Sequence, residues 1–168
     1  MSRLIRSFTD LRARNNAGED VDFGAFADKV VLVVNAQSSS SLPTTTVATP
    51  RPPRAHPTHR GLPTAASPCP PQFASEEPGT AADIKAFYVD AHKLPAASLM
   101  ERVDVNGANT HEVYKFLKGT PELGEKIEWN FTKFVVGRDG QVLGRYPQRT
   151  KPKDFDKMFA EMFAQAES

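Results

Sequence analysis

Proline crowds one internal segment of this chain and limits what it can fold into. Nine of the 14 prolines lie within residues 37–71, where a run of four serines precedes them. Proline has no backbone N–H to donate, and its ring blocks helix interiors and central strands alike. The segment also shows neither helical nor strand periodicity of apolar residues. We therefore expect residues 37–71 to be disordered or in polyproline II conformation, between two folded parts at 1–36 and 72–168.

The first folded part carries the strongest strand signal in the chain. Five consecutive apolar residues, four of them valines, occupy Val30–Val34, a run typical of a strand buried on both faces. Before it, Thr9–Ala13 and Glu19–Phe23 flank a turn at Asn15–Gly18, which predicts an N-terminal β-hairpin. A parallel neighbour for the buried strand needs a crossover of a dozen or more residues, usually helical. Residues 37–71 have the length but not the composition, so we expect that crossover helix and the following strand to be missing or disordered.

The second folded part alternates helix and strand signals. Thr80 and Asp83 fit a capping box, and the apolar residues Ile84, Phe87, Tyr88 and Ala91 follow at helical spacing. After this helix the sequence predicts an extended segment, a helix, two strands joined by a hairpin turn, and a last helix: Leu99–Val105, Thr110–Lys118, Thr132–Val136, Gln141–Tyr146 and the residues from Pro152 onward. The full order predicts an α/β fold with a mixed central sheet and helices on both faces.

Composition and charge exclude several classes of protein. Twenty-one basic and 20 acidic residues leave a formal net charge of +1, which gives no general attraction to nucleic acid or anionic membranes. The longest apolar run is far too short to span a bilayer, and the N-terminus lacks the apolar core of a signal peptide, so we expect a cytoplasmic protein. The single cysteine, Cys69, excludes an internal disulfide and a multi-cysteine zinc site. Together with His56 and His59 it makes too sparse a set for a metal centre, and we expect none.

Four stretches of the sequence resemble one protein family. The most specific contains Trp129-Asn130, within Glu128–Phe134, and is similar to the tryptophan–asparagine signature of the glutathione peroxidases. The others resemble the strand before the family's reactive residue, the segment before its second major helix, and its aspartate-valine-asparagine-glycine turn: Val30–Asn35, Phe73–Thr80 and Asp104–Asn109. The resemblance covers residues 5–36 and 72–165. It implies a single domain over residues 1–168 with a thioredoxin-like fold.

The resemblance also implies a reaction and the positions that carry it. The family reduces hydrogen peroxide or lipid hydroperoxides in defence against oxidative stress, with glutathione or thioredoxin as co-substrate and without a prosthetic cofactor or metal. A cysteine or selenocysteine attacks the peroxide, and glutamine, tryptophan and asparagine side chains stabilise its anion. Carried onto this chain, these four positions fall on Ser40, Glu76, Trp129 and Asn130. Because the nucleophile and the glutamine are both replaced, we expect the chain as it stands to be inactive.

Three further features bear on partners and stability. Tyr88 stands where thioredoxin-dependent members of the family carry a resolving cysteine, which favours glutathione as the reductant. Few residues separate Gly119 from Trp129, so the insertion that supports tetramers in some members is absent, and we expect a monomer. The loss of a helix and a strand from residues 37–71 predicts a poorly folded chain with one face of Val30–Val34 exposed to water.

The altered segment has two interpretations. A displaced reading frame, or a gene model that bypasses an in-frame UGA codon for selenocysteine, would put unrelated residues at 37–71 and remove the nucleophile at Ser40. In that case the protein without this alteration, which we call the parent enzyme, would be the peroxidase. Alternatively, the chain is a catalytically dead thioredoxin-fold binding protein whose proline-rich loop, with a PxxP motif at Pro50–Pro53, recruits a partner. The sequence does not distinguish among the hydroperoxides or fix the reductant.

Overall fold

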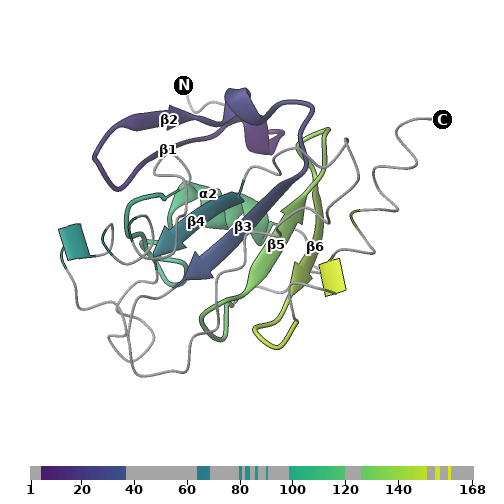
Figure 1. Cartoon of the computed structure of the whole chain (residues 1–168). Helices are drawn as coiled ribbons and strands as arrows, with labels where there is room; N and C mark the ends of the chain where they lie inside the picture. Colours follow the sequence, from purple (N-terminus) through teal and green to yellow (C-terminus); the bar gives the residue numbers. More distant parts are fainter. Residues whose placement is uncertain are drawn as a thin grey trace.

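A four-stranded mixed sheet with a two-stranded hairpin across one end forms the centre of the molecule (Figure 1). A computed structural model describes residues 5–36, 64–68, 80, 82–83, 86, 90, 99–119, 126–150, 154–155 and 159. The sheet has the order β4–β3–β5–β6, with the bounds Thr64–Pro68, Val31–Ala36, Lys133–Val136 and Val142–Tyr146. β3 is parallel to β4 and antiparallel to β5, and β5 is antiparallel to β6. The mixed sheet predicted from the order of elements is confirmed.

The N-terminal hairpin forms where the sequence predicts it, with shorter strands. β1 (Arg12–Arg14) pairs antiparallel with β2 (Asp20–Asp22). The predicted outer ends of the two strands are instead 3₁₀ turns, η1 (Phe8–Asp10) and η2 (Phe23–Phe26). Local hydrogen bonds explain the difference, because the side chains of Ser7 and Asp22 cap these turns and satisfy backbone N–H groups that a longer ladder would need.

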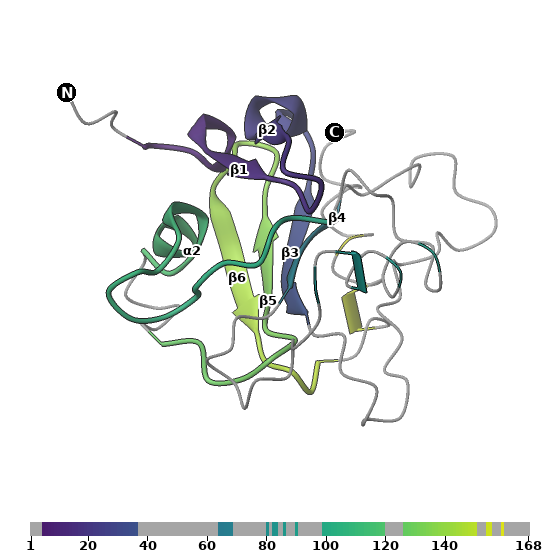
Figure 2. The ribbon, with the colours of Figure 1, turned by 90° about the vertical axis from the view of Figure 1, so that its left-hand side faces the viewer.

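β3 is buried on both faces, as its apolar run predicts. Every residue of Val30–Val34 is at most 6% exposed. Val33 packs on the side of the hairpin and helix α2 (Glu112–Leu117), whereas Leu32 packs on the opposite side with Phe155 and Phe159. Figure 2 shows this arrangement, with α2 on one side of the sheet and the helical residues near the C-terminus on the other. The expectation that one face of this strand is exposed is therefore wrong, because the C-terminal phenylalanines cover it.

β4 lies inside the proline-rich segment, where the sequence predicts no strand. Its register with β3 runs from Leu32↔Thr64 to Ala36↔Pro68. The first four residues, Thr-Ala-Ala-Ser, contain no proline, so their N–H groups can join the ladder, and proline stands only at the last position. β4 has one partner among the described strands, and an edge position tolerates proline. The expectation that this strand is missing is wrong. The rest of residues 37–71, including the expected crossover, lies outside the described residues.

Helix α2 (Glu112–Leu117) covers one face of the sheet and confirms the helix predicted over Thr110–Lys118. Val113 and Leu117 are buried, as their spacing predicts. Tyr114 is also buried, at 1% exposed, and its ring meets that of Phe134 edge-on at a centroid distance of 6.4 Å. The sequence pattern did not single out Tyr114, because a tyrosine is equally common at half-exposed positions.

Two other predicted helices are described only in part. The capping box at Thr80 is present, because the Asp83 carboxylate accepts hydrogen bonds from the Thr80 N–H (2.8 Å) and hydroxyl (2.7 Å). These bonds hold the pKa of Asp83 below its usual range. The apolar residues that follow, from Ile84 to Ala91, lie outside the described side chains. Near the C-terminus, Phe155 and Phe159 are helical and buried, and most of the helix predicted from Pro152 is outside the described residues.

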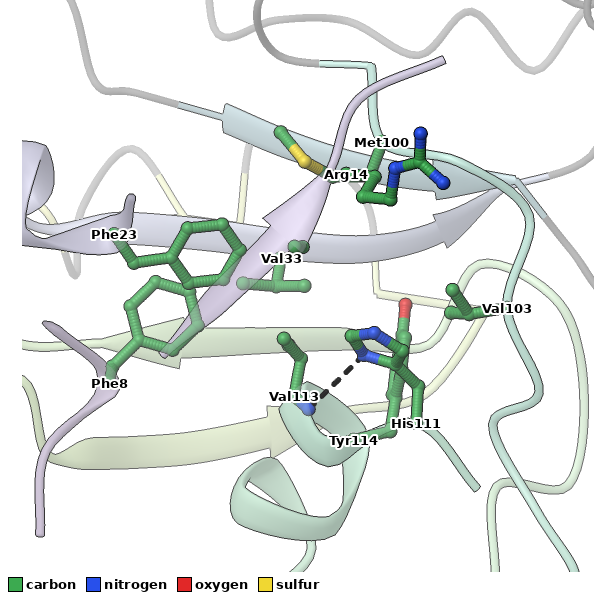
Figure 3. Close-up of a pocket in the computed structure, with 10 residues that line it drawn as sticks. Phe8, Arg14, Phe23, Val33, Met100, Val103, His111, Val113 and Tyr114 are labelled. Carbon is green, nitrogen blue, oxygen red and sulfur yellow. Dashed lines mark hydrogen bonds between the residues drawn. The ribbon is translucent and has the colours of Figure 1, made fainter. Parts of the chain in front are cut away.

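A small apolar cavity lies between the hairpin, the sheet and α2 (Figure 3). Phe8, Phe23, Met100 and Tyr114 are among the residues that line it. Its volume of about 20 Å³ has room for one water molecule. A pocket for a small molecule begins at roughly 300 Å³, so this cavity is a packing feature and not a substrate site.

His111 lies at the edge of this cavity and is the N-cap residue of α2. Its Nδ1 accepts a hydrogen bond from the Val113 N–H at 3.3 Å, drawn as the dashed line in Figure 3. Burial lowers the pKa of His111, and the carboxylates of Glu101 and Glu112 oppose that effect while Lys115 adds to it. The neutral imidazole is therefore the form that the folded chain holds, since the protonated ring could not accept the bond.

This arrangement predicts that stability falls in mild acid. The unfolded chain binds a proton on His111 at a higher pH than the folded chain, so the free energy of unfolding decreases as the pH drops below 6.5, the ordinary pKa of histidine. In His111→Asn the side-chain oxygen still caps the helix but does not titrate. Urea unfolding at about pH 7.5 and about pH 5.5 should show a smaller loss of stability in the variant. Equal losses in the two proteins would contradict this role.

Candidate active site

The residues Trp129–Thr132 form a tight turn directly before β5. The Thr132 hydroxyl donates a hydrogen bond to the Trp129 carbonyl at 3.0 Å and closes the turn. Phe131 has a φ of 58°, in the left-handed region, which is uncommon for an aromatic residue. Asn130 is fully buried, whereas Trp129 is 43% exposed. The turn therefore presents an indole at the surface and holds the neighbouring amide inside the protein.

Asn35 anchors this turn to the carboxyl end of β3. Its side-chain Nδ2 donates to the Trp129 carbonyl at 3.2 Å. Its backbone carbonyl accepts from the Phe131 N–H at 2.6 Å, and its N–H donates to the Thr132 carbonyl at 3.3 Å. One fully buried residue thus contacts three of the four residues of the turn. The geometry brings Trp129 and Asn130 to the end of the strand that precedes position 40.

A second asparagine holds the segment before the turn. Asn106 accepts a hydrogen bond from the Ile127 N–H at 2.8 Å and donates one to the Ile127 carbonyl at 2.7 Å. The side chain of Asn106 therefore pairs with Ile127 as a neighbouring strand would. Lys118, at the end of α2, reaches the Val105 carbonyl at 2.7 Å and fixes the loop that carries Asn106.

Two basic side chains lie beside the turn and bond to backbone carbonyls. Lys133 donates to the carbonyls of Gln148 and Thr150 at 2.9 and 3.0 Å, and its burial lowers its pKa. Arg145 donates to the Lys126 carbonyl at 2.6 Å. Burial lowers the pKa of Arg145, and the carboxylate of Glu128 opposes that effect. Both side chains support the loops around the turn.

The four positions implied by the resemblance fall into two groups. Trp129 and Asn130 are described and adjacent, whereas Ser40 and Glu76 lie outside the described residues. Sequence reasoning missed Asn35 and Asn106 as supports of the site. Asn35 did carry a signal, because an amide directly after five apolar residues occupies a position where a buried strand would place another apolar side chain.

Among the described residues, no three histidine or carboxylate side chains are grouped so that they could hold a metal ion. None of the helices among the described residues is long and apolar enough to cross a membrane.

The family model for glutathione peroxidase matches residues 8–118. The chain belongs to the glutathione peroxidase family. Two curated relatives from Caenorhabditis elegans support the assignment: glutathione peroxidase 1 is 35% identical over 94% of this chain and 96% of its own length, and glutathione peroxidase 2 is 38% identical over 91% and 94%. The chain is thus a peroxidase by family, and the reaction of that family is reduction of hydroperoxides by a thiol donor. The family match spans the proline-rich segment and ends before Trp129.

Solved structures confirm the predicted thioredoxin-like fold. The crystal structure of Trgpx in apo form matches with a TM-score of 0.63 and 28% identity, over 95% of this chain and 96% of the other. The structure of a putative thioredoxin from Neisseria meningitidis matches with a TM-score of 0.53 over 96% and 91%, and at 14% identity it supports the fold alone. The match to the peroxidase is the better of the two.

The exposure of Trp129 predicts a smaller effect on stability than a core aromatic residue would have. Replacing it by alanine should cost about 1–3 kcal/mol, because 43% of its surface stays in contact with water in the folded chain. Phe134 is fully buried, and Phe134→Ala should cost about 3–5 kcal/mol. Urea unfolding of the two variants measures the difference. Equal losses of stability in the two variants would mean that Trp129 acts as a core residue, which would contradict its exposed position.

Proposed function

We propose that this fold reduces hydroperoxides through a thiolate or selenolate at position 40, with the indole N–H of Trp129 and the amide of Asn130 as donors to the anion. The observation that carries the proposal is the anchoring of the Trp129–Thr132 turn by Asn35. Position 40 follows Asn35 by five residues, and that length of chain reaches at most about 17 Å. A nucleophile at position 40 is therefore within reach of the turn.

The proposed chemistry needs an anion that is stable at neutral pH. A free thiol has a pKa of about 8.5, and hydrogen-bond donors lower it by stabilising the thiolate. The thiolate attacks the terminal peroxide oxygen, the O–O bond breaks, and the leaving oxygen takes a proton to become water or an alcohol. The sulfur is then a sulfenic acid. One glutathione converts it to a mixed disulfide with loss of water, and a second restores the thiol and leaves oxidised glutathione.

Ser40 cannot carry out this cycle. A serine hydroxyl is not appreciably ionised at neutral pH, and its oxygen has no counterpart of the sulfenic state. Glu76, at the position of the family's glutamine, would place a second negative charge near the nucleophile and oppose its ionisation. We propose that the chain as written is inactive and that the parent enzyme carries cysteine or selenocysteine at position 40.

We propose lipid hydroperoxides as a substrate class for the parent enzyme, beside hydrogen peroxide. A relative from Mesembryanthemum crystallinum that is 36% identical over 90% of this chain is named a probable phospholipid hydroperoxide glutathione peroxidase. A relative from Synechocystis that is 41% identical over 76% of the chain is named a hydroperoxy fatty acid reductase. The exposure of Trp129 fits a large substrate, because an indole at the surface leaves room for a bulky hydroperoxide to approach. Tyr88 at the resolving position favours glutathione as the donor.

The proposal predicts that Ser40→Cys creates peroxidase activity. With glutathione, glutathione reductase and cumene hydroperoxide, consumption of NADPH should be absent in the unaltered chain and measurable in Ser40→Cys. Adding Glu76→Gln should raise the rate further. Adding Trp129→Phe should lower kcat/KM about 100-fold, the usual effect of removing one donor to a developing charge.

The neighbouring serines provide a matched control for this experiment. Ser38→Cys introduces the same thiol two residues away, so it tests whether turnover depends on position 40 or on any accessible thiol. Turnover that is equal in the two variants, or insensitive to Trp129→Phe, would contradict the proposed site. Absence of turnover in Ser40→Cys with Glu76→Gln would favour the second candidate, a binding protein whose proline-rich loop with Pro50–Pro53 recruits a partner.

We also propose that the protein is a monomer. The support is the short connection between Gly119 and Trp129, which lacks the insertion that holds tetramers together in some members of the family. Sedimentation velocity should give the mass of one chain, with no change on tenfold dilution. A concentration-dependent shift to the mass of a dimer or tetramer would overturn this proposal and leave the family assignment untouched.

A further inference from the structure

Asn35 is a polar side chain in a place where an apolar one would bury more surface. It is fully buried at the end of a strand whose preceding five residues are all apolar. Its Nδ2 bonds to the Trp129 carbonyl, whereas its Oδ1 has no hydrogen-bond partner among the described residues. A buried oxygen without a partner costs free energy, so the amide here contributes less to stability than its buried position would allow.

Residues 126–132, which we call the tryptophan segment, are held by hydrogen bonds near both ends. Asn106 pairs with both backbone groups of Ile127 near its start, and Asn35 bonds to Trp129, Phe131 and Thr132 near its end. The two asparagines come from different parts of the fold, the loop before α2 and the end of β3. The side chains of both asparagines and the backbone of Asn35 thus fix a stretch that contains no regular secondary structure.

The backbone of this segment needs such support. Phe131 has a φ of 58°, and a bulky residue stays in that region only where its surroundings hold it there. The hydrogen bonds that hold it are those of Asn35 and of the turn itself. If they weaken, Phe131 can return to an ordinary conformation, and this change rotates the peptide planes that direct Trp129 and Asn130.

We propose that Asn35 and Asn106 are positioning residues that clamp the tryptophan segment and thereby fix the directions of the Trp129 indole and the Asn130 amide. The meaning of this clamp for catalysis rests on the proposed function, but the clamp itself is a property of the folded chain. Neither asparagine touches the substrate in this proposal, and each acts through the backbone of its neighbours.

The test uses the emission of Trp129, which is the only tryptophan in the chain. Asn35→Leu keeps the size of the side chain and the backbone bonds, and it removes both the Nδ2 donor and the unpartnered oxygen. The unfolding midpoint should stay near that of the unaltered protein. The anisotropy of Trp129 should fall, and acrylamide should quench its emission more strongly. The Phe131 amide keeps its bond to the Asn35 carbonyl, but loss of the Nδ2 bond to the nearby Trp129 carbonyl should let the turn open more often and make this amide exchange with solvent about fivefold faster.

A second pair of variants keeps the proposal testable if Asn35→Leu does not fold. Asn106→Leu removes both bonds to Ile127 and should shift the Trp129 emission in the same direction. Asn106→Asp keeps the acceptor for the Ile127 N–H and replaces the donor by an oxygen that repels the Ile127 carbonyl, so it should still protect that amide from exchange while the Trp129 emission shifts.

The matched control is Asn15→Leu, the same substitution at another buried asparagine. Asn15 accepts hydrogen bonds from the N–H groups of Ala17 and Glu19 and holds the β1–β2 turn, so its loss should leave the Trp129 signal unchanged. Trp129 signals in Asn35→Leu and Asn106→Leu that match those of Asn15→Leu would overturn the proposal. The asparagine variants are made in the chain that carries Ser40, so this test is independent of the activity experiment with Ser40→Cys. If Ser40→Cys fails to turn over peroxide, the proposed function is contradicted but the result on the clamp is unaffected.

Discussion

The contact between the end of β3 and the Trp129–Thr132 turn is the interaction on which the rest of the account depends. Burial of Val30–Val34 on both faces fixes the strand at the centre of the sheet. Asn35 lies near the end of that strand and forms three hydrogen bonds with the turn, one from its side chain and two from its backbone. Trp129 and Asn130 are therefore positioned by the hydrophobic core, although they lie almost one hundred residues away from β3 in the sequence.

Much of the fold can be predicted from local sequence patterns. The apolar run of β3 and the turn residues of the two hairpins each specify their element within a few residues, and the structure confirms them. At Thr80 the structure shows the predicted hydrogen bonds to Asp83, whereas most of the helix that should follow lies outside the described residues. The exception is β4. Its Thr-Ala-Ala-Ser sequence has weak strand propensity and many prolines around it, so only the free edge of β3 can select it. The cover that Phe155 and Phe159 give to β3 is likewise a tertiary contact that no local pattern reveals.

The residues of the proposed site can be chosen from the sequence, but the contacts that hold them cannot. Trp129 and Asn130 stand out through their likeness to a family signature, whereas the hydrogen bonds of Asn35 and Asn106 depend on distant backbone groups. The proposed nucleophile position, Ser40, and the proposed glutamine position, Glu76, both lie outside the described residues. Under the proposed function, the chain keeps two donors for an anionic sulfur or selenium and carries serine where the charged atom would stand.

The bond between the turn and Asn35 can be tested directly by nuclear magnetic resonance. A hydrogen bond transmits a scalar coupling between the donor nitrogen and the carbonyl carbon of the acceptor. The 2.6 Å contact predicts a measurable coupling between the Phe131 amide nitrogen and the Asn35 carbonyl carbon. A spectrum that shows the couplings between β3 and β5 but none between Phe131 and Asn35 would contradict the account.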